Sequence, residues 1–404
     1  MTPGGPIVVV GIGADGWAGL GEGARVAIRA ADEVIGAARQ LALLPSDVPR
    51  TRAWPSPMDP LLDAIVTRTE GATCVLASGD PMLHGIGATL VRRAGIARVR
   101  IFPHPSAFAI ACARLGWPAA DVELVSAVAR PPAVVVRSLQ PGRRIITYVT
   151  GRDGAAKLAK ALRDRGFGPS RFVVLEQLGG PLERVIESSA QAWGDDLADP
   201  LHSVAIEPRT DPGAPAYARV PGLPDDAFSS DGQLTKRHVR AATLAALAPQ
   251  PGELLWDVGA GSGSISIEWL RCERTARAIA IEARADRAAR IGANAAALGV
   301  PGLDVLVGRA PAALEGLSAP DAVFVGGGIT TPALIDRCWS ALAAGGRLVA
   351  NTVTLEGEQI VFDARHKHGG TLARIDIAHA EPIGGFTGWR AQMPVVQWSA
   401  RKEA

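Results

Sequence analysis

Short apolar runs of strand length are followed along the chain by segments in which apolar residues recur with helical spacing. In the second half this alternation is regular. It predicts strands at 253–261, 276–283, 303–308, 321–328, 347–353, 371–380 and 394–400. It also predicts helices at 264–271, 284–299 and 331–346. Alternating β and α units form a parallel, doubly wound sheet, which binds ligands at the carboxyl ends of its strands.

The first half carries a similar alternation that is less regular. Its apolar runs predict strands at 6–13, 73–81, 98–106, 122–128, 143–151, 171–179 and 202–208. Its helical spacings predict helices at 85–95, 107–116 and 154–166. The Pro131-Pro132 pair interrupts the pattern, and such breaks separate elements. We therefore expect this half to consist of two α/β lobes.

The stretch 208–232 separates the two halves. It is rich in Pro, Gly, Asp and Ser and has no sustained apolar period, which is typical of a linker or a long ordered loop. A chain of 404 residues also exceeds one ordinary hydrophobic core. The sequence predicts a two-lobed α/β domain at 1–208, a linker at 209–224 and a Rossmann-like, doubly wound domain at 225–404.

Composition excludes several classes of protein. The formal net charge is +2, which gives no electrostatic footprint for a nucleic acid. The cysteines are far apart and form no C-x-x-C pair, so we expect neither a disulfide framework nor a metal site; they are Cys74, Cys112, Cys272 and Cys338. No apolar run reaches about 18 residues and no secretory signal is visible. We expect a cytoplasmic, soluble protein that binds neither nucleic acid nor membrane.

Two glycine-rich loops follow apolar strands and are the first candidates for chemistry. The first has the spacing of the dinucleotide fingerprint, and the second is a G-x-G-x-G loop; their glycines are Gly11, Gly13, Gly16, Gly259, Gly261 and Gly263. Glycine lets the backbone approach a ligand closely and adopt a positive φ. Spacing alone does not distinguish NAD from other nucleotides.

Residues beside the second loop favour S-adenosylmethionine. Asp257 lies two residues before the first glycine, where a carboxylate suits an ammonium or a sulfonium better than a pyrophosphate. Glu282 ends the next strand, where a carboxylate can accept both ribose hydroxyls, although this feature also fits NAD. The segment 308–314, which follows the third strand, fits the adenine edge of methyltransferases.

Two other classes remain as alternatives. A nucleotide-dependent oxidoreductase would need Asp32 or Glu33 as the ribose acceptor of the first loop, at a tolerable spacing of about 20 residues. The segment that starts there opens a strand rather than closing one, which argues against NAD. A non-catalytic tetrapyrrole or adenosylmethionine sensor would bind ligands without turnover, but a sensor needs only one pocket.

Residues near the second loop indicate the acceptor. Methyltransferases of nucleic-acid or glutamine amines carry an Asn/Asp-Pro-Pro-aromatic turn after the fourth strand, where this chain has Gly326-Gly327-Gly328. A glycine turn leaves room for a large planar substrate. Lys236, Arg237 and Arg240 place three cations within five residues, as a polycarboxylate substrate would require.

Several sequence segments carry a resemblance to known families. DGQLTKRHVR, WDVGAGSGSISIEW, AIAIEA, VGRAPAAL and VFVGGG resemble the decarboxylating precorrin carbon-15 methyltransferases. VVVGIGADGWAGL, VLASGDPMLHGIGATL and HPSAFAIACARLGW resemble the precorrin carbon-5 branch of the tetrapyrrole methylase family. Both sets in one chain, in this order, are similar to the fused precorrin-6Y C(5,15)-methyltransferase family.

The resemblance implies a bifunctional C-methyltransferase of cobalamin biosynthesis that uses one S-adenosyl-L-methionine per domain. The first domain would methylate carbon 5 of the tetrapyrrole. The second would methylate carbon 15 and release carbon dioxide from the ring C acetate, so that precorrin-6Y/6B becomes precorrin-8X. It also implies that both halves self-associate and that no metal or redox cofactor is needed.

The resemblance also assigns site residues. In the first domain the cofactor contacts are Gly11, Gly13, Ser78, Gly79, Asp80, Leu83, Ser106 and Ala107. In the second they are Thr235, Gly259, Ala260, Gly261, Ser262, Gly263, Glu282 and Ala310. The expected substrate-binding residues are Lys236, Arg237, Arg240, Gly326, Gly327 and Gly328.

No general base can be assigned from the sequence. The family often carries a Ser-x-His-Gly-Arg segment, which here reads Ser126-Ala127-Val128-Ala129-Arg130 and lacks the histidine. Arg130 either meets a substrate carboxylate or caps a lobe. Lys236, His238 and Arg240 are the candidates for catalysis and for orienting the departing acetate; the remaining histidines, including His366 and His368, form no ligand constellation.

Overall fold

The chain folds into two compact units in a computed structural model that describes residues 5–48 and 50–403. The first unit contains the chain up to Pro132 together with Gln140–Pro215, and the second contains Ala133–Leu139 and Ala216–Ala404. The division at 215 falls within the expected linker. Each unit has its own sheets and its own hydrophobic core, so the two are described separately.

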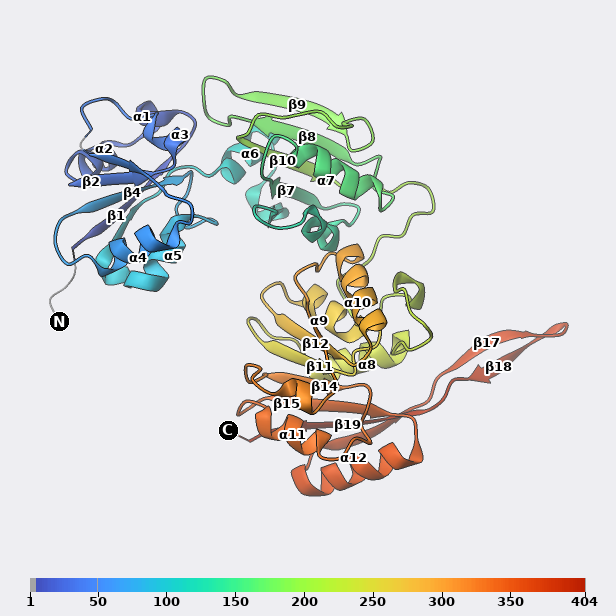
Figure 1. Cartoon of the computed structure of the whole chain (residues 1–404). Helices are drawn as coiled ribbons and strands as arrows, with labels where there is room; N and C mark the ends of the chain where they lie inside the picture. Colours follow the sequence, from blue (N-terminus) through green and yellow to red (C-terminus); the bar gives the residue numbers. More distant parts are fainter. Residues whose placement is uncertain (1–4, 49, 404) are drawn as a thin grey trace. The chain divides into compact units, whose positions relative to one another are not determined.

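The first lobe of the first unit is a parallel sheet covered by helices (Figure 1). Its elements are β1 (Ile7–Ile12), α1 (Gly16–Gly19), α2 (Glu22–Arg29), β2 (Glu33–Gly36), α3 (Ala38–Leu41), β3 (Thr51–Ala53), α4 (Asp59–Thr67), β4 (Thr73–Ser78), α5 (Ile86–Ala94) and β5 (Val99–Phe102). The strand order is β3-β2-β4-β1-β5. Val9 and Val10 of β1 point to opposite faces and both are fully buried, as a parallel strand covered on both sides requires.

The second lobe is a mixed sheet in the order β6-β7-β10-β8-β9. Its elements are α6 (Ala107–Leu115), β6 (Val122–Ser126), β7 (Arg144–Tyr148), α7 (Gly154–Arg163), β8 (Arg171–Glu176), β9 (Arg184–Ser189) and β10 (His202–Glu207). Helix α6 packs on this sheet, because Ala111 and Cys112 form one core cluster with Ile146 and Val173. The apolar pattern did not predict β9, which is a largely exposed edge strand with no apolar run.

The second unit is a seven-stranded sheet in the order β13-β12-β11-β14-β15-β19-β16. Its elements are α8 (Arg237–Leu247), β11 (Leu254–Val258), α9 (Ser264–Cys272), β12 (Arg277–Glu282), α10 (Ala285–Ala297), β13 (Asp304–Val307), β14 (Ala322–Val325), α11 (Leu334–Ala341), β15 (Arg347–Thr352), α12 (Leu355–His368), β16 (Thr371–Ile375), β17 (Ala378–Ile383), β18 (Phe386–Ala391) and β19 (Val395–Arg401). Helices α8, α9 and α10 cover one face, and α11 and α12 cover the other (Figure 1). The order reverses between β11 and β14, which is where doubly wound sheets bind ligands.

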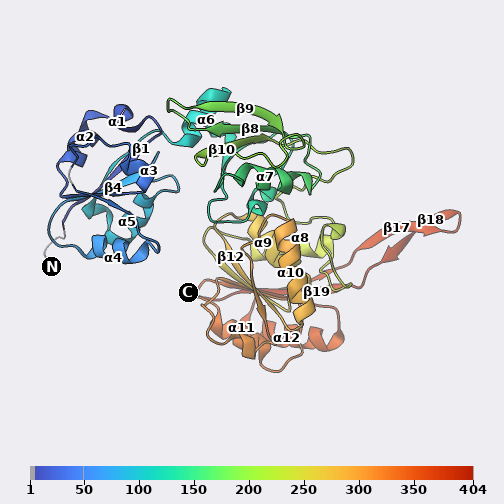
Figure 2. The same cartoon turned by 45° about the horizontal axis from the view of Figure 1, so that its top comes forward.

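The end of the chain departs from a purely parallel sheet. β19 is inserted between β15 and β16 and runs antiparallel to both. The strand expected at 371–380 is divided between β16, which joins the sheet, and β17, which pairs with β18 in a separate hairpin. This hairpin projects away from the sheet (Figure 2). Helix α12 was not predicted because it buries only Gly357, Val361 and Ala364 of its 14 residues.

The domain limits proposed from the sequence need two adjustments. The segment Ala133–Leu139 belongs to the second unit: Arg137 donates to the Leu270 carbonyl at 3.1 Å, and Arg219 donates to the Ser138 hydroxyl at 2.9 Å. Residues 216–224 also belong there, because the Glu268 carboxylate accepts the backbone N–H groups of 222 and 223. None of the described helices is long and apolar enough to cross a membrane.

Candidate functional site

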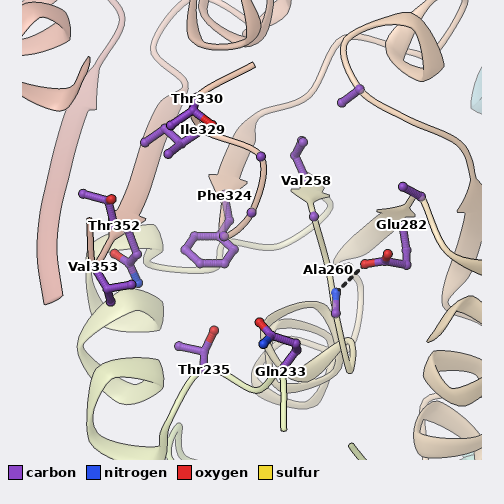
Figure 3. Close-up of a pocket in the computed structure, with 18 of the residues that line it drawn as sticks. Gln233, Thr235, Val258, Ala260, Glu282, Phe324, Ile329, Thr330, Thr352 and Val353 are labelled. Carbon is purple, nitrogen blue, oxygen red and sulfur yellow. Dashed lines mark hydrogen bonds between the residues drawn. The ribbon is translucent and has the colours of Figure 1, made fainter. Parts of the chain in front are cut away.

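A cavity of about 1230 Å³ opens at the carboxyl ends of β11, β12, β14 and β15. Its wall is assembled from loops that are distant in the sequence: 232–236 before α8, 258–261 after β11, 308–310 after β13, 326–331 after β14 and 351–354 at the end of β15. Gln392 and Met393, at the base of the hairpin, complete it. The labelled side chains in Figure 3 surround this cavity.

The second glycine loop brings bare backbone to the cavity. Gly259 has φ +72°, and a Cβ there would lie 2.7 Å from Gly327 Cα, so the loops after β11 and β14 are in backbone contact. Gly261 has φ +60°, and a Cβ would lie 3.2 Å from the Gln233 carbonyl. Any side chain at these positions would separate the loops or occupy the cradle between them.

Glu282 lies at the rim of this cradle and is only 5% exposed. Its Oε2 accepts from Gly261 N at 2.9 Å (Figure 3). Its Oε1 accepts from Arg284 N at 3.0 Å. Each carboxylate oxygen has a second lone pair that can accept from a ligand hydroxyl. Thr235 and Ala310 also line the cavity. A buried carboxylate beside a backbone cradle fits the ribose of a nucleoside such as S-adenosylmethionine.

The remaining residues predicted for the second glycine loop and for the turn after β14 differ in whether they line the cavity. Ala260 lines the cavity with Gly259 and Gly261. Ser262 and Gly263 are not among the lining residues: the Ser262 carbonyl accepts from Asn294 at 3.0 Å, and a Cβ at Gly263 would lie 2.6 Å from the Ile291 side chain. These two residues shape the loop from behind. The turn Gly326–Gly328 lines the cavity.

Asp257 does not face the cavity, contrary to the expectation that it meets a sulfonium. It is fully buried, and its Oδ2 accepts from both the backbone N–H and the hydroxyl of Ser266 in the first turn of α9. Burial, with the nearby negative charge of Glu282, raises the pKa of Asp257 to about 6. The carboxylate therefore anchors α9 to β11.

The structure separates the cation cluster that the sequence placed together. Lys236 lines the cavity. Arg240 is fully buried and pairs with Glu268 at 2.5 Å and with Asp225 at 3.2 Å, so the expected roles in substrate binding and catalysis are corrected to a structural one. Its position one turn into α8 directs the side chain into the core. Arg237 is exposed and donates to the Gly222 carbonyl at 2.8 Å, outside the lining residues.

His238 is also outside the cavity lining. It is exposed, and its ring centroid lies 5.5 Å from that of His379 on β17. The cavity instead contains polar residues that the sequence analysis missed, above all Asn351 and Arg309. An asparagine at the end of the apolar run 347–353 is a signal that could have identified Asn351, because ligands bind at that edge of a doubly wound sheet.

The first unit brings three loops together, those that follow β1, β4 and β5. A Cβ on Gly11 would overlap the Gly79 carbonyl oxygen and would lie 2.9 Å from His104 N. Gly79 has φ +58°, and a Cβ there would lie 3.2 Å from Ser106 Cα. The Ser106 hydroxyl accepts from Ala109 N at 3.1 Å and caps α6. Predicted contacts from all three loops thus lie at one edge of the sheet.

Hydrogen bonds hold the loop after β4. The Ser78 hydroxyl accepts from Gln40 at 3.0 Å, and Asp80 Oδ1 accepts from Met82 N at 2.8 Å. Leu83 N donates to the Asp80 carbonyl at 3.2 Å, which closes the turn. Ala107 is the first residue of α6, directly after Ser106. The backbone here is therefore fixed before a ligand arrives.

A side-chain contact at the first glycine loop was not predicted from the sequence. His104 Nε2 lies 3.2 Å from Asp15 Oδ1, and a Cβ on Gly13 would lie 2.6 Å from that nitrogen. Tyr148 on β7 was not predicted either; it lies opposite Ser126 of β6 and accepts from Phe108 N at 3.0 Å. Burial raises the pKa of Tyr148.

The structure argues against NAD binding at the first glycine loop, because the carboxylates that would have to bind the ribose lie elsewhere. Glu33 is the first residue of β2, so it lies at the amino end of a parallel strand, whereas the glycine loop lies at the carboxyl end of β1. Arg68 pairs with Glu33 at 3.0 Å. Asp32 accepts from Ala72 N at 2.7 Å. Both carboxylates are thus engaged away from the glycine-loop edge.

Comparisons with known proteins match both halves. A family model described as "Tetrapyrrole (Corrin/Porphyrin) Methylases" matches residues 6–192, and one described as "Precorrin methyltransferase domain" matches residues 226–402. A "Precorrin-6Y C(5,15)-methyltransferase [decarboxylating]" from Sinorhizobium sp. is 48% identical over 98% of this chain and 96% of its own length.

Two shorter relatives each cover 44% of this chain. One is a "Cobalt-precorrin-7 C(5)-methyltransferase" from Salmonella typhimurium, 34% identical over 88% of its length. The other is a "Probable cobalt-precorrin-6B C(15)-methyltransferase (decarboxylating)" from Pyrobaculum calidifontis, 34% identical over 93% of its length.

Proposed function

The chain belongs to the precorrin-6Y C(5,15)-methyltransferase (decarboxylating) family, and from this membership we propose that its two methylations take place in two separate S-adenosylmethionine sites, one in each unit. It is an S-adenosylmethionine-dependent methyltransferase of cobalamin biosynthesis whose substrate is a precorrin. The observation that carries the two-site proposal is the presence of two complete loop assemblies at the carboxyl ends of two different sheets.

We assign carbon 5 to the first unit and carbon 15, with decarboxylation, to the second. The family models support this division, since the tetrapyrrole methylase match lies in 6–192 and the precorrin methyltransferase match in 226–402. The two half-length relatives, each named for only one of the two carbons, support the same division. Each unit of this chain would therefore hold one cofactor.

In the second unit, bound S-adenosylmethionine supplies an electrophilic methyl group on a sulfonium. Glu282 would accept from the ribose hydroxyls, while the backbone at 259–261 and the residues Thr235 and Ala310 hold the rest of the nucleoside. The turn Gly326–Gly328 leaves space for the flat macrocycle, and Lys236 would pair with one of its carboxylates. Holding methyl donor and carbon in line can lower the barrier by about 7–11 kcal/mol.

In the first unit, the loop Ser78–Leu83 and the start of α6 would hold the second cofactor. Gly79 provides the close backbone approach, and Ser106 and Ala107 present the amino end of a nine-residue helix. Gly11 and Gly13 allow the first glycine loop to lie against the loops after β4 and β5. Arg130 is exposed shortly after the end of β6 and is the candidate in this unit for contact with a substrate carboxylate.

A matched pair of glycine variants tests the two-site proposal. Gly79→Val and Gly261→Val each place a β-branched side chain at a positive φ, with the new Cβ 3.2 Å from backbone in both cases. Gly79→Val should stop carbon-5 methylation and accumulate a decarboxylated product with one new methyl group. Gly261→Val should stop carbon-15 methylation and carbon dioxide release.

Mass spectrometry of the tetrapyrrole products distinguishes the outcomes. Gly95→Val is the control, because Gly95 also has a positive φ but nothing lies within 4 Å of its Cβ position. It should make the wild-type product. Loss of both methylations in Gly79→Val would mean that the two sites do not act independently.

We also propose that the chain self-associates through the β17–β18 hairpin. Phe386 and Trp389 on β18 are 85% and 78% exposed, and Ile383 on β17 is 63% exposed. Large apolar side chains exposed together on one hairpin are typical of a protein–protein contact. Sedimentation of a Phe386→Ser, Trp389→Ser double variant should show a smaller particle than the wild type.

The cytoplasmic location expected from the sequence stays a prediction.

A further inference from the structure

A polar network at the wall of the second cavity has no part in the cofactor contacts described above. Asn351 near the end of β15 lines the cavity, and its Nδ2 donates to Thr243 Oγ1 at 2.8 Å. Gln397 Nε2 donates to Asn351 Oδ1 at 3.0 Å and to Thr243 Oγ1 at 3.1 Å. Thr243 is fully buried and Gln397 is 7% exposed, so the network is rigidly placed between α8, β15 and β19.

Asn351 retains hydrogen-bonding capacity for a ligand. A side-chain amide has two N–H donors and two acceptor sites on its oxygen. The network uses one N–H for Thr243 and one acceptor site for Gln397. One donor and one acceptor are left on a side chain whose orientation is fixed by two buried partners.

Asn351 lines the cavity from β15, which β11 and β14 separate in the sheet from β12 and its Glu282. In Figure 3, Thr352 and Val353 lie on one side and Glu282 on the other, with the ring of Phe324 between them. The lining residues within 324–334, 351–356 and 392–395 include no lysine, arginine or histidine. The cations that line the cavity come from other segments; they are Lys236, Arg287 and Arg309.

Resting on the proposed function of the second unit, we propose that Asn351 contacts the departing acetate carboxylate of the precorrin and orients the bond that breaks. Gln397 and Thr243 are then positioning residues that act through Asn351. The candidates for this role from the sequence are Lys236, His238 and Arg240, of which only Lys236 lines the cavity.

The reaction balances without a further co-reactant. Transfer of the methyl group from the sulfonium to carbon 15 breaks the S–CH₃ bond and leaves an iminium in the macrocycle. The bond between the acetate CH₂ and its carboxylate then breaks, carbon dioxide leaves, and the electron pair moves into the conjugated system and neutralises the iminium. A proton from water finally adds to the former CH₂ carbon, which becomes a methyl group, and loss of one N–H proton from the macrocycle to water restores its neutral charge.

A neutral amide suits this step better than a cation. The breaking bond must stand perpendicular to the plane of the macrocycle so that its electrons enter the conjugated system, and a fixed hydrogen bond can hold that angle. A guanidinium would bind the carboxylate in a strong bidentate pair. That interaction would be lost as the carboxylate becomes neutral carbon dioxide, so it would stabilise the ground state over the transition state.

The experiment measures carbon dioxide release per methyl group transferred, in the full chain, with a precorrin substrate labelled in the ring C acetate carboxyl group. Asn351→Ala should lower this ratio at least tenfold and accumulate a carbon-15-methylated product that keeps its carboxylate. Its affinity for S-adenosylmethionine, measured by calorimetry, should stay within twofold of the wild type. Gln397→Leu should lower the ratio in the same direction by a smaller factor.

Two further variants keep the test decisive. Asn351→Asp has nearly the same shape and still accepts from Gln397, and its charge should repel the departing carboxylate and reduce the ratio below that of Asn351→Ala. Gln359→Ala is the control, because Gln359 is an exposed amide on α12 that bonds only Asp363 and is not among the lining residues.

The outcomes separate this proposal from the assignment of function. An unchanged ratio in both Asn351 variants overturns it. A parallel loss of methylation and carbon dioxide release also overturns it, because Asn351 would then serve substrate binding or folding in general. A wild-type chain that releases no carbon dioxide would contradict the function proposed for the second unit instead.

Discussion

At the scale of residues, side chains of the same charge have different roles according to where they are buried. Lys236 and Arg240 are four positions apart, yet Lys236 lines the cavity and Arg240 is fully buried in a pair with Glu268. Glu282 and Asp257 are both buried carboxylates near the glycine loop, but only Glu282 lines the cavity. Depth therefore decides which charges are available to a ligand.

Asp257 should make the stability of the second unit depend on pH. Its pKa in the folded state, about 6, is above the ordinary value of 3.8. Between about pH 4 and pH 6 the folded state therefore binds a proton that the unfolded chain has lost, and stability falls as pH rises. The loss amounts to at most about 3 kcal/mol.

Denaturant unfolding of the full chain between pH 4 and pH 7 measures this effect. Asp257→Asn cannot titrate, so the fall in stability across this range should be smaller than in the wild type by up to that amount. A slope identical in both proteins would show that Asp257 does not carry the pH dependence.

Glu282→Ala should weaken S-adenosylmethionine binding in one of the two proposed sites. The loss of charge-assisted hydrogen bonds to the ribose corresponds to roughly 1.5–3 kcal/mol, or about 10- to 150-fold in Kd. Calorimetric titration of the full chain would reveal one weakened site and one unchanged site. Glu207→Ala is the control, because Glu207 also ends a strand but lies in the first unit away from the loops; unchanged affinities in Glu282→Ala would remove Glu282 from the site.

At the scale of elements, the site depends on how closely neighbouring loops approach. The loops after β11 and β14 touch through Gly259 and Gly327, where a Cβ would lie 2.7 Å from backbone. In the first unit, Gly11 and Gly79 make the equivalent close contact between the loops after β1 and β4. In both units the strands supply rigid ends, and glycine permits the loops to meet.

Gly259→Ala should therefore destabilise the second unit by more than the cost of placing alanine at a positive φ. Gly316 has a similar φ of +77° but nothing within 4 Å of its Cβ position. Gly316→Ala should cost about 1–2 kcal/mol from the left-handed backbone alone. Gly259→Ala should cost an additional 1–3 kcal/mol from the clash and should lose cofactor affinity.

Thermal unfolding and cofactor titration of both variants check this difference. Equal destabilisation, with cofactor binding intact in both, would contradict the backbone contact between the two loops.

At the scale of the whole molecule, the chain passes from one folding unit to the other more than once. The segment Ala133–Leu139 lies between two parts of the first unit in sequence but packs with the second. Val135 in this segment is fully buried. Residues 217 and 218 are also held, since Arg271 donates to both of their carbonyls. The chain therefore passes between the two units three times, at 132–133, 139–140 and 215–216.

A fragment that begins at residue 216 should fold and bind one equivalent of S-adenosylmethionine. It keeps the contacts of Arg271 but lacks 133–139, so it should be less stable than the second unit of the full chain, by roughly 1.5–3 kcal/mol for the buried valine alone. Circular dichroism, calorimetry and denaturant unfolding test this. Val135→Ala in the full chain should reproduce part of the loss, and a fragment that is unfolded at neutral pH would contradict the domain division.

The sequence by itself determined the central strands, the two glycine loops and the carboxylate of Glu282. These follow from local patterns: a buried parallel strand reads as an apolar run, and a loop at its carboxyl end is adjacent to it in the chain. Strands without such a run escaped prediction. The edge strand β9 and strand β18 are mostly exposed, so their sequences lack the apolar signal, and only the first three residues of β17 fell within a predicted strand.

Only the tertiary structure decided which side chains share a cavity. The rotation of α8 sends Arg240 into the core and leaves Lys236 at the site, and the pairing of β15 with β19 places Asn351 opposite Gln397. Neither outcome is encoded in the spacing of residues along the chain. The neighbours of a side chain depend on how separate elements pack, and in this protein β15 and β19 are joined by some forty residues of helix, strand and hairpin.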